Sequence, residues 1–303
     1  MNQDLGQLNT EAIDSRFSKI DTLSTLDLLK LFNDSDKSVA EEVAKVLPRV
    51  ADAISEITRR IESGGRLIYV GAGTSGRLGV LDASECIPTF SLEDGLVIGL
   101  IAGGDTALRT GIEGAEDVLE GAIENLKKLK FSEKDSLVGI AASGRTPYVI
   151  GALKYAKEVG AASIALSCNL NSEISKYCDI AIEVNTGAEI LAGSTRLKAG
   201  TAQKLVLNMI STVSMINLGK TYGNLMVDLQ VNNIKLRDRA IRIIQAATSC
   251  DVERAQKALK EAQDQVKVAI VMILLEISAN EARSSLKSAN SRVRDALKKP
   301  MNT

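Results

Sequence analysis

Five short apolar runs between residues 67 and 184 constrain the fold of this chain more than any other feature. Stretches with helical periodicity separate them. Buried strands that alternate with helices are typical of βαβ units, whose strands lie parallel in one sheet. The pattern predicts a doubly wound α/β domain with a five-stranded parallel sheet in the order 2-1-3-4-5. The predicted strands are Leu67–Val70, Leu96–Ile101, Ser136–Ala141, Ser163–Leu166 and Ile180–Val184.

The chain on either side of this core is predicted to be helical. Ser24–Asp27 and Ser38–Glu41 have the spacing of capping boxes, so each is expected to open a helix, and the second helix is expected to stop at Pro48. After Asn232 no strand signal remains, and apolar stripes at helical spacing predict a small bundle. The expected parts are an N-terminal helical arm over residues 1–50, the α/β domain over 51–232 and a C-terminal helical bundle over 233–303.

Composition excludes several kinds of chemistry. The chain has no histidine, so it holds neither a histidine-centred catalytic triad nor a histidine-bearing zinc site. Lys plus Arg is 37 and Asp plus Glu is 38, which gives a net charge of −1. This balance disfavours a general nucleic-acid or membrane-surface binder, which needs a basic excess. Proton transfer near neutral pH is therefore expected from carboxylates, lysine, tyrosine or cysteine.

The cysteines and the apolar runs indicate a compartment. Cys86, Cys168, Cys178 and Cys250 form no CxxC pair, so neither a structural zinc site nor a thioredoxin-like motif is expected. Scattered single cysteines are typical of reduced thiols in the cytosol. The first residues lack the basic start and apolar run of a signal peptide, and the run Val268–Leu275 is too short to span a bilayer. We therefore expect a soluble, cytoplasmic protein.

Two loops that follow predicted strands combine glycine with hydroxyl side chains. Residues 71–77 (GAGTSGR) follow the first strand, and residues 143–147 (SGRTP) follow the third. Glycine lets a ligand approach the backbone, and the free N–H groups at a helix start favour an anion. Thr146 and Pro147 suit the N-cap and N1 positions of the next helix. Strands one and three flank the switch in strand order, so both loops are expected to converge on one phosphate.

Dinucleotide binding is the main alternative for the first loop, which matches GxGxxG at Gly71, Gly73 and Gly76. A dinucleotide site needs an acidic residue at the end of the second strand to hold the ribose. The nearest candidate, Asp105, lies 105 − 76 = 29 residues beyond Gly76 and behind two glycines. An NAD site would also leave the second loop unexplained. A tight turn with a purely structural role is the other interpretation.

Several strings of residues make the chain resemble a known family. The two loops resemble the sugar isomerase (SIS) domain family of phosphosugar-binding proteins. Longer strings are more specific: Leu81–Cys86, Glu113–Asp117, Gly139–Tyr148, Lys198–Lys204 and Asn224–Asp228. These strings are similar to the N-acetylmuramic acid 6-phosphate etherase family, and the resemblance covers nearly the whole chain, including the helical tail. Asp14 and Ile87 depart from the family pattern, which usually has asparagine and proline there.

The resemblance implies a lyase that cleaves the lactyl ether of N-acetylmuramic acid 6-phosphate to N-acetylglucosamine 6-phosphate and D-lactate, in cell-wall recycling. The family's members are dimers related to the glucokinase regulatory protein, so a homodimer is implied. By motif, the two catalytic glutamates fall on Glu85 and Glu116. The implied route, elimination on the open-chain sugar and then addition of water, needs an acid, a base and a phosphate clamp. It needs no metal and no other cofactor, and we expect no nucleic-acid or membrane partner.

The two glutamates also have a structural interpretation, because a glutamate on a helix is usually a solvated surface charge. Glu85 lies among apolar residues, which is consistent with partial burial and a raised pKa. Glu116 is expected early in the helix after the second strand, near the same edge of the sheet.

The candidate binding residues are open to two interpretations as well. Arg77 and Arg145 either hold the phosphate or cap a helix, and Lys204 reaches either the ligand or a carboxylate. Ser194 either contacts the ligand or caps the helix that follows the fifth strand. The candidate substrate-binding residues are Gly73, Thr74, Ser75, Gly76, Arg77, Ser143, Gly144, Arg145, Thr146, Ser194 and Lys204.

A non-catalytic phosphosugar sensor is the alternative from another functional class. Such sensors often carry a DNA-binding helix-turn-helix module, and no basic recognition helix is visible in this sequence. A sensor also has no need for Glu85 and Glu116 together. The sequence therefore favours the lyase.

Overall fold

The computed structural model describes residues 8–231 and 233–298 and divides the chain into two compact units. The first unit holds the residues before Glu85 together with residues 95–211, and the second holds residues 85–94 and the chain from Thr212 onward. Helices α3 (Gly73–Phe90) and α6 (Lys198–Asn217) each begin in the first unit and end in the second. The domain boundaries given above stay a prediction.

The first unit is built on a five-stranded parallel sheet in the order β2-β1-β3-β4-β5, as predicted. All five strands lie where the apolar runs place them. Residues of β1, β3 and β4 are buried throughout, which explains why these strands appear in the sequence as continuous apolar runs. The strands are β1 Leu67–Gly71, β2 Val97–Ile101, β3 Ser136–Ala141, β4 Ala162–Ser167 and β5 Ile180–Glu183.

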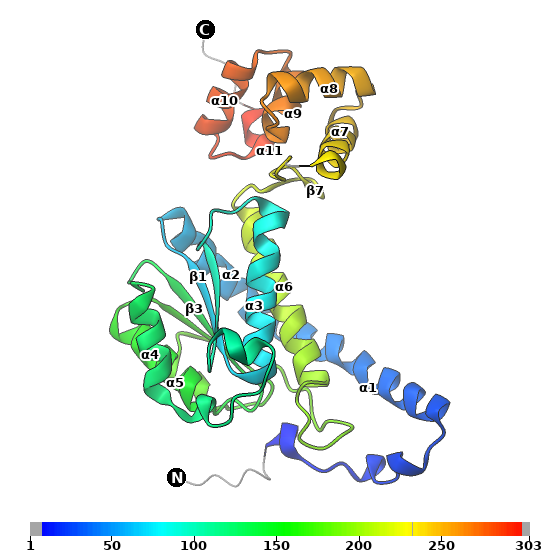
Figure 1. Ribbon diagram of the computed structural model, residues 1–303, viewed down its shortest axis with the longest axis vertical. Helices are drawn as coiled ribbons and strands as arrows, with labels where there is room; N and C mark the ends of the chain where they lie inside the picture. The colour runs from blue at the N-terminus through cyan, green and yellow to red at the C-terminus, as the bar shows by residue number, and fades with distance from the viewer. Residues whose placement is uncertain (1–7, 232, 299–303) are drawn as a thin grey trace. The chain divides into compact units, whose positions relative to one another are not determined.

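Helices cover both faces of this sheet (Figure 1). Side chains alternate between the faces along a strand. Ile68 and Val70 of β1 therefore pack into the hydrophobic cluster that includes residues of α4 and α5. Tyr69 lies between them and faces α3, where its hydroxyl reaches Asp82 at 2.9 Å. The remaining helices that begin in this unit are α1 Thr25–Lys45, α2 Leu47–Glu62, α4 Leu119–Lys128 and α5 Pro147–Glu158, with short 3₁₀ helices η2 Asn9–Glu11, η3 Ser15–Phe17, η4 Ile20–Thr22, η5 Asp105–Leu108, η6 Ala115–Asp117 and η7 Ile174–Tyr177.

The N-terminal helices differ from their prediction in two respects. Ser24 caps α1, and its hydroxyl accepts the backbone N–H of Asp27, as expected. Ser38, however, lies inside α1 and donates its hydroxyl to the carbonyl of Ser35, so it opens no helix. Pro48 stands in the first turn of α2 instead of ending a helix. Proline is tolerated there because the first N–H groups of a helix have no intrahelical partner.

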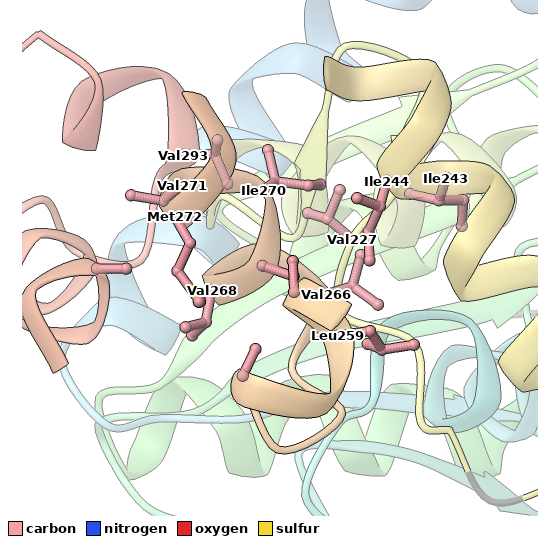
Figure 2. Close-up of a cluster of buried hydrophobic side chains, with 14 of the residues drawn as sticks. Val227, Ile243, Ile244, Leu259, Val266, Val268, Ile270, Val271, Met272 and Val293 are labelled. Carbon is pink, nitrogen blue, oxygen red and sulfur yellow. The ribbon is translucent and has the colours of Figure 1, made fainter. Parts of the chain in front are cut away.

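The second unit is helical, as predicted, around its own hydrophobic core (Figure 2). Helix α9 is buried along most of its length, and Ile243 and Ile244 of α7 and Leu259 of α8 pack against the same core. We did not expect the short antiparallel hairpin of β6 and β7, because strands of two residues show no alternation in the sequence. The elements are β6 Thr221–Tyr222, β7 Leu225–Met226, α7 Ile234–Thr248, α8 Val252–Glu261, α9 Val266–Leu275, α10 Ala279–Ser288 and α11 Val293–Ala296.

Among residues 8–231 and 233–298, no helix combines the length and the apolar character that crossing a bilayer requires.

The contact between α4 and α5 predicts opposite effects for two glycines. A Cβ on Gly151 of α5 would lie 2.2 Å from the carbonyl oxygen of Leu119, whereas a Cβ on Gly121 of α4 would find its nearest neighbour at 3.6 Å. Gly151→Ala is therefore expected to lower the free energy of unfolding by about 1–3 kcal/mol. Gly121→Ala should leave it unchanged or raise it by up to about 1 kcal/mol. Denaturant unfolding followed by circular dichroism measures both, and equal stability of the two variants would contradict this packing.

Candidate active site

The two glycine-hydroxyl loops emerge side by side from the sheet. Strands β1 and β3 are neighbours, and Gly71 pairs in register with Ile140. The chain therefore leaves both strands at one edge, turns through residues 71–73 into α3 and through residues 142–146 into α5. This juxtaposition is the one predicted from the strand order.

The first loop is held tightly against the sheet. A Cβ on Gly76 would lie 2.6 Å from Cγ1 of Ile101 and 2.7 Å from the carbonyl oxygen of Gly71, so only glycine permits this approach. Ser75 is buried, and its hydroxyl donates to Oε1 of Gln203 on α6 at 3.0 Å. Gly73 is exposed, and Thr74 is half-buried.

The second loop has the conformation that its glycine requires. Gly144 has a φ of +71°, and a Cβ there would lie 2.3 Å from that of Ser172. The Ser143 hydroxyl accepts the backbone N–H of Arg145 at 3.3 Å. Thr146 is the N-cap of α5 and Pro147 follows at its start, as predicted. Within the described chain, the Thr146 hydroxyl takes no capping bond, which leaves it available to a ligand.

Arg77 is held by the protein's own backbone. Its Nη2 donates to the carbonyl of Ala107 at 2.8 Å and its Nε to that of Leu108 at 3.2 Å. Both carbonyls belong to η5, which follows β2. These contacts favour the structural interpretation of Arg77. Arg145 is half-buried beside its loop, and its charge lowers the pKa of Glu173 in addition to the larger effects of hydrogen bonds from Lys176 and Tyr177.

Glu85 and Glu116 differ from their predicted surroundings. Glu85 lies on α3 in the second unit and is exposed, so the expected partial burial is wrong for this single chain. Its neighbour Leu81 is 53% exposed, which explains why apolar flanks in the sequence do not bury the carboxylate. Glu116, also exposed, lies in the 3₁₀ helix η6 of the first unit and not in the α-helix that follows.

Helix α6 is capped by a residue that we did not predict. Ser194 precedes the helix by four residues, and its carbonyl accepts the N–H of Leu197. The cap is Glu189, which is 1% exposed and accepts the backbone N–H groups of Lys198 (3.0 Å) and Ala199 (2.9 Å). Burial raises the pKa of Glu189, and the two N–H bonds oppose this shift. Lys204 is exposed on the same helix.

Two further buried charges lie close to the loops. Asp82 on α3 accepts hydrogen bonds from Tyr69 on β1 and from Asn208 and Ser211 on α6, and burial raises its pKa. Lys198 is 7% exposed, and burial lowers its pKa while the charge of Glu189 opposes that effect. Both residues lie in strings that carry the family resemblance, so the sequence marked their positions but did not show that they are buried.

No group of three or more Cys, Asp or Glu side chains suited to a metal ion gathers among the residues described.

Comparisons with known proteins first define the class. Residues 49–157 match the glucokinase regulatory protein N-terminal SIS domain, residues 118–213 the SIS domain, and residues 223–266 the C-terminal lid domain of glucokinase regulatory protein. A phosphoheptose isomerase from Francisella tularensis has the same fold, with a TM-score of 0.52 and 20% identity, over 64% of this chain and all of that one. The chain is a SIS-domain protein.

Curated relatives then identify the family. An N-acetylmuramic acid 6-phosphate etherase from Caldanaerobacter subterraneus subsp. tengcongensis is 53% identical over 97% of this chain and 96% of its own. An enzyme of the same name from Pectobacterium atrosepticum is 52% identical over 98% of each chain. The protein belongs to the N-acetylmuramic acid 6-phosphate etherase family.

The contacts of Arg77 predict that its loss affects folding first. Arg77→Met is expected to lower the free energy of unfolding by about 1.5–3 kcal/mol, because the carbonyls of Ala107 and Leu108 lose a charged donor. Arg109→Met, which removes an exposed cation from the same segment, is the control. Denaturant unfolding and titration with inorganic phosphate separate the two interpretations. Unchanged stability with weaker phosphate binding would show that Arg77 serves the ligand.

Proposed function

We infer that this protein is a carbon–oxygen lyase that cleaves the D-lactyl ether of N-acetylmuramic acid 6-phosphate to give N-acetylglucosamine 6-phosphate and D-lactate. The observation that carries this conclusion is identity of 52–53% over nearly the whole chain to etherases of that name. The reaction belongs to the recycling of cell-wall amino sugars. Incubation of the purified protein with N-acetylmuramic acid 6-phosphate should release D-lactate in equal amount to the amino sugar phosphate. Binding of the sugar without release of D-lactate would instead identify a sensor.

The reaction proceeds on the open-chain sugar by elimination and then hydration. A base removes the proton from C2, the C3–O bond breaks, and an acid protonates the departing lactate oxygen. Water then adds at C3 of the unsaturated aldehyde, and a proton returns to C2. The route exchanges the lactyl oxygen on C3 for the oxygen of water and returns each proton that it removes, so its balance requires no redox cofactor and no metal.

The phosphate is assigned to the two loops at the ends of β1 and β3. Ser143 and Thr146, with the backbone N–H groups of the two loops, present neutral donors at the start of α3 and α5. Ser75 stays a candidate in the first loop, although its hydroxyl donates to Gln203 in the free protein. The positive end of each helix dipole adds to the attraction. The free Thr146 hydroxyl supports this assignment, since a capping bond does not occupy it. Gly73, Thr74, Gly76, Gly144 and Arg145 shape the same loops, and Ser194 and Lys204 stay candidates for the sugar.

The proton carriers are assigned to Glu85 and Glu116. Without histidine, carboxylates are the groups best suited to this work, and the family's strings place both residues. We assign Glu85 as the acid toward lactate and Glu116 as the base at C2.

A homodimer completes the proposal. Helix α1 buries Val39 and Val43, whereas none of the described residues 25–38 is buried, and Leu26 and Leu29 are 62% and 61% exposed. A second copy of this chain is the occupant that the family resemblance implies for this apolar half-helix. The mass of the protein in solution decides this point. A cytoplasmic location is supported by the four cysteines, which are all in the thiol form and not in disulfides.

Ser143→Ala is expected to weaken binding of the phosphorylated sugar by roughly tenfold or more, because one hydrogen bond to a charged group contributes about 1.5–3 kcal/mol. Ser63→Ala, which removes an exposed hydroxyl at the end of α2, is the matched control. Calorimetric titration with the phosphorylated and the unphosphorylated sugar measures the difference. The phosphate assignment fails if wild-type protein binds both sugars equally tightly.

Glu85→Gln and Glu116→Gln are each expected to lower turnover by roughly 10²–10⁴-fold, the usual contribution of general acid–base catalysis. Binding should change much less, because glutamine keeps the size of the side chain. Glu120→Gln on the exposed face of α4 is the control. Proton exchange at C2 in deuterated water separates the roles: the Glu85 variant should exchange this proton and release little lactate, and the Glu116 variant should do neither. Full activity of both variants would refute the assignment.

A further inference from the structure

Lys198, the first residue of α6, is a buried cation without a partner. It is 7% exposed, and among the described residues its ammonium makes no hydrogen bond and no ion pair. Lys267 on α9 is equally buried, but it donates to Asp228 at 2.7 Å. A buried charge costs free energy unless a partner compensates it. No group in the described part of the folded chain compensates the cost of burying the Lys198 ammonium through a hydrogen bond or an ion pair.

Glu189, the carboxylate with the strongest electrostatic effect on Lys198, already accepts other hydrogen bonds. Both oxygens of Glu189 accept backbone N–H groups at the start of α6, so Glu189 neutralises the helix terminus. The other charges that act on Lys198 are Asp14, Arg16 and Asp36. Asp14 is bound to the guanidinium of Arg16, and Asp36 is exposed on α1. The ammonium is left with the capacity to bind one more anion.

The first turn of α6 lies at the ligand edge of the sheet. The carbonyl of Ala199 accepts the thiol of Cys168, which directly follows β4, at 3.6 Å. A Cβ on Gly200 would lie 3.5 Å from Cγ2 of Thr74 in the phosphate loop after β1. Lys198 is therefore placed beside the loops to which the phosphate is assigned, on a helix whose own N–H groups are not free to bind it.

The substrate carries a second anion besides its phosphate. This is the carboxylate of the lactyl group, which leaves with the product D-lactate and is absent from N-acetylglucosamine 6-phosphate. We propose that the ammonium of Lys198 binds the lactyl carboxylate and so distinguishes substrate from product. This proposal rests on the proposed function. In a buried setting the pair is strong because little water screens it, and the substrate's charge offsets the cost of burying the lysine.

Lys198→Met tests the proposal, because it keeps most of the stem and removes the charge. The expected result is a fall of roughly 10- to 100-fold in kcat/KM for release of D-lactate, the range expected for one charge-assisted hydrogen bond. The inhibition constant of N-acetylglucosamine 6-phosphate should stay within about twofold of wild type, because this product has no lactyl carboxylate. Lys198→Arg, which keeps the charge, should recover part of the loss. Lys128→Met, an exposed lysine of α4, is the control.

Two results would overturn the proposal: unchanged kcat/KM in Lys198→Met, or an equal loss of affinity for substrate and product. The second result would mean that Lys198 serves the phosphate or the integrity of the site. The methyl ester of the lactyl carboxylate gives a test that needs no variant. It should bind wild-type protein roughly 10- to 100-fold more weakly than the acid, and equal affinity refutes the proposal. Failure of the proposed function is distinct, because wild-type protein would then release no D-lactate.

Discussion

The carboxylate of Asp82 holds together the elements on which the site depends. It is 5% exposed and accepts hydrogen bonds from Tyr69, Asn208 and Ser211, so one buried charge joins β1, α3 and α6. Three donors compensate the cost of burying it. The first turn of α3 follows the loop after β1 to which we assign the phosphate. The position of α3 against β1 thus determines where this loop lies.

Two buried polar groups near the start of α6 lack the hydrogen-bond partners that Asp82 has. Ser75 donates to Oε1 of Gln203, while Nε2 of Gln203 is buried without an acceptor among the described residues. Lys198, five residues earlier on the helix, is buried without a partner as well. The folded chain satisfies Asp82 fully and leaves these two donors unsatisfied. Buried donors of this kind cost stability, and a bound ligand is one way to complete their hydrogen bonding.

Apolar runs and glycine loops were sufficient to predict the sheet, because a strand buried on both faces is apolar at every position and β1, β3 and β4 are of this kind. Sequence motifs predicted helix starts, helix caps and side-chain burial less well, because these features depend on residues distant in the sequence. The Ser38 string has the spacing of a capping box, yet α1 continues through it, and the Ser38 hydroxyl donates to the carbonyl of Ser35 in the preceding turn. Glu189 could not be identified as a cap, because it lies nine residues before the helix that it caps. Glu85 and Leu81 are both exposed on α3, and the apolar residues around Glu85 in the sequence do not show which side chains other elements cover.

In the site that we propose, the capping of α6 also orients the substrate. Three helices begin at this edge, and each start attracts an anion. At α3 and α5 the loops leave backbone N–H groups and hydroxyls for a phosphate, whose charge at neutral pH is about −1.5 to −2. At α6, Glu189 occupies the N–H groups, so a phosphate would meet a carboxylate there and be repelled. The single positive charge of Lys198 matches the single negative charge of the lactyl carboxylate. In the proposed site the phosphate is bound at α3 and α5 and the lactyl group at α6, and the sugar then has one orientation between them.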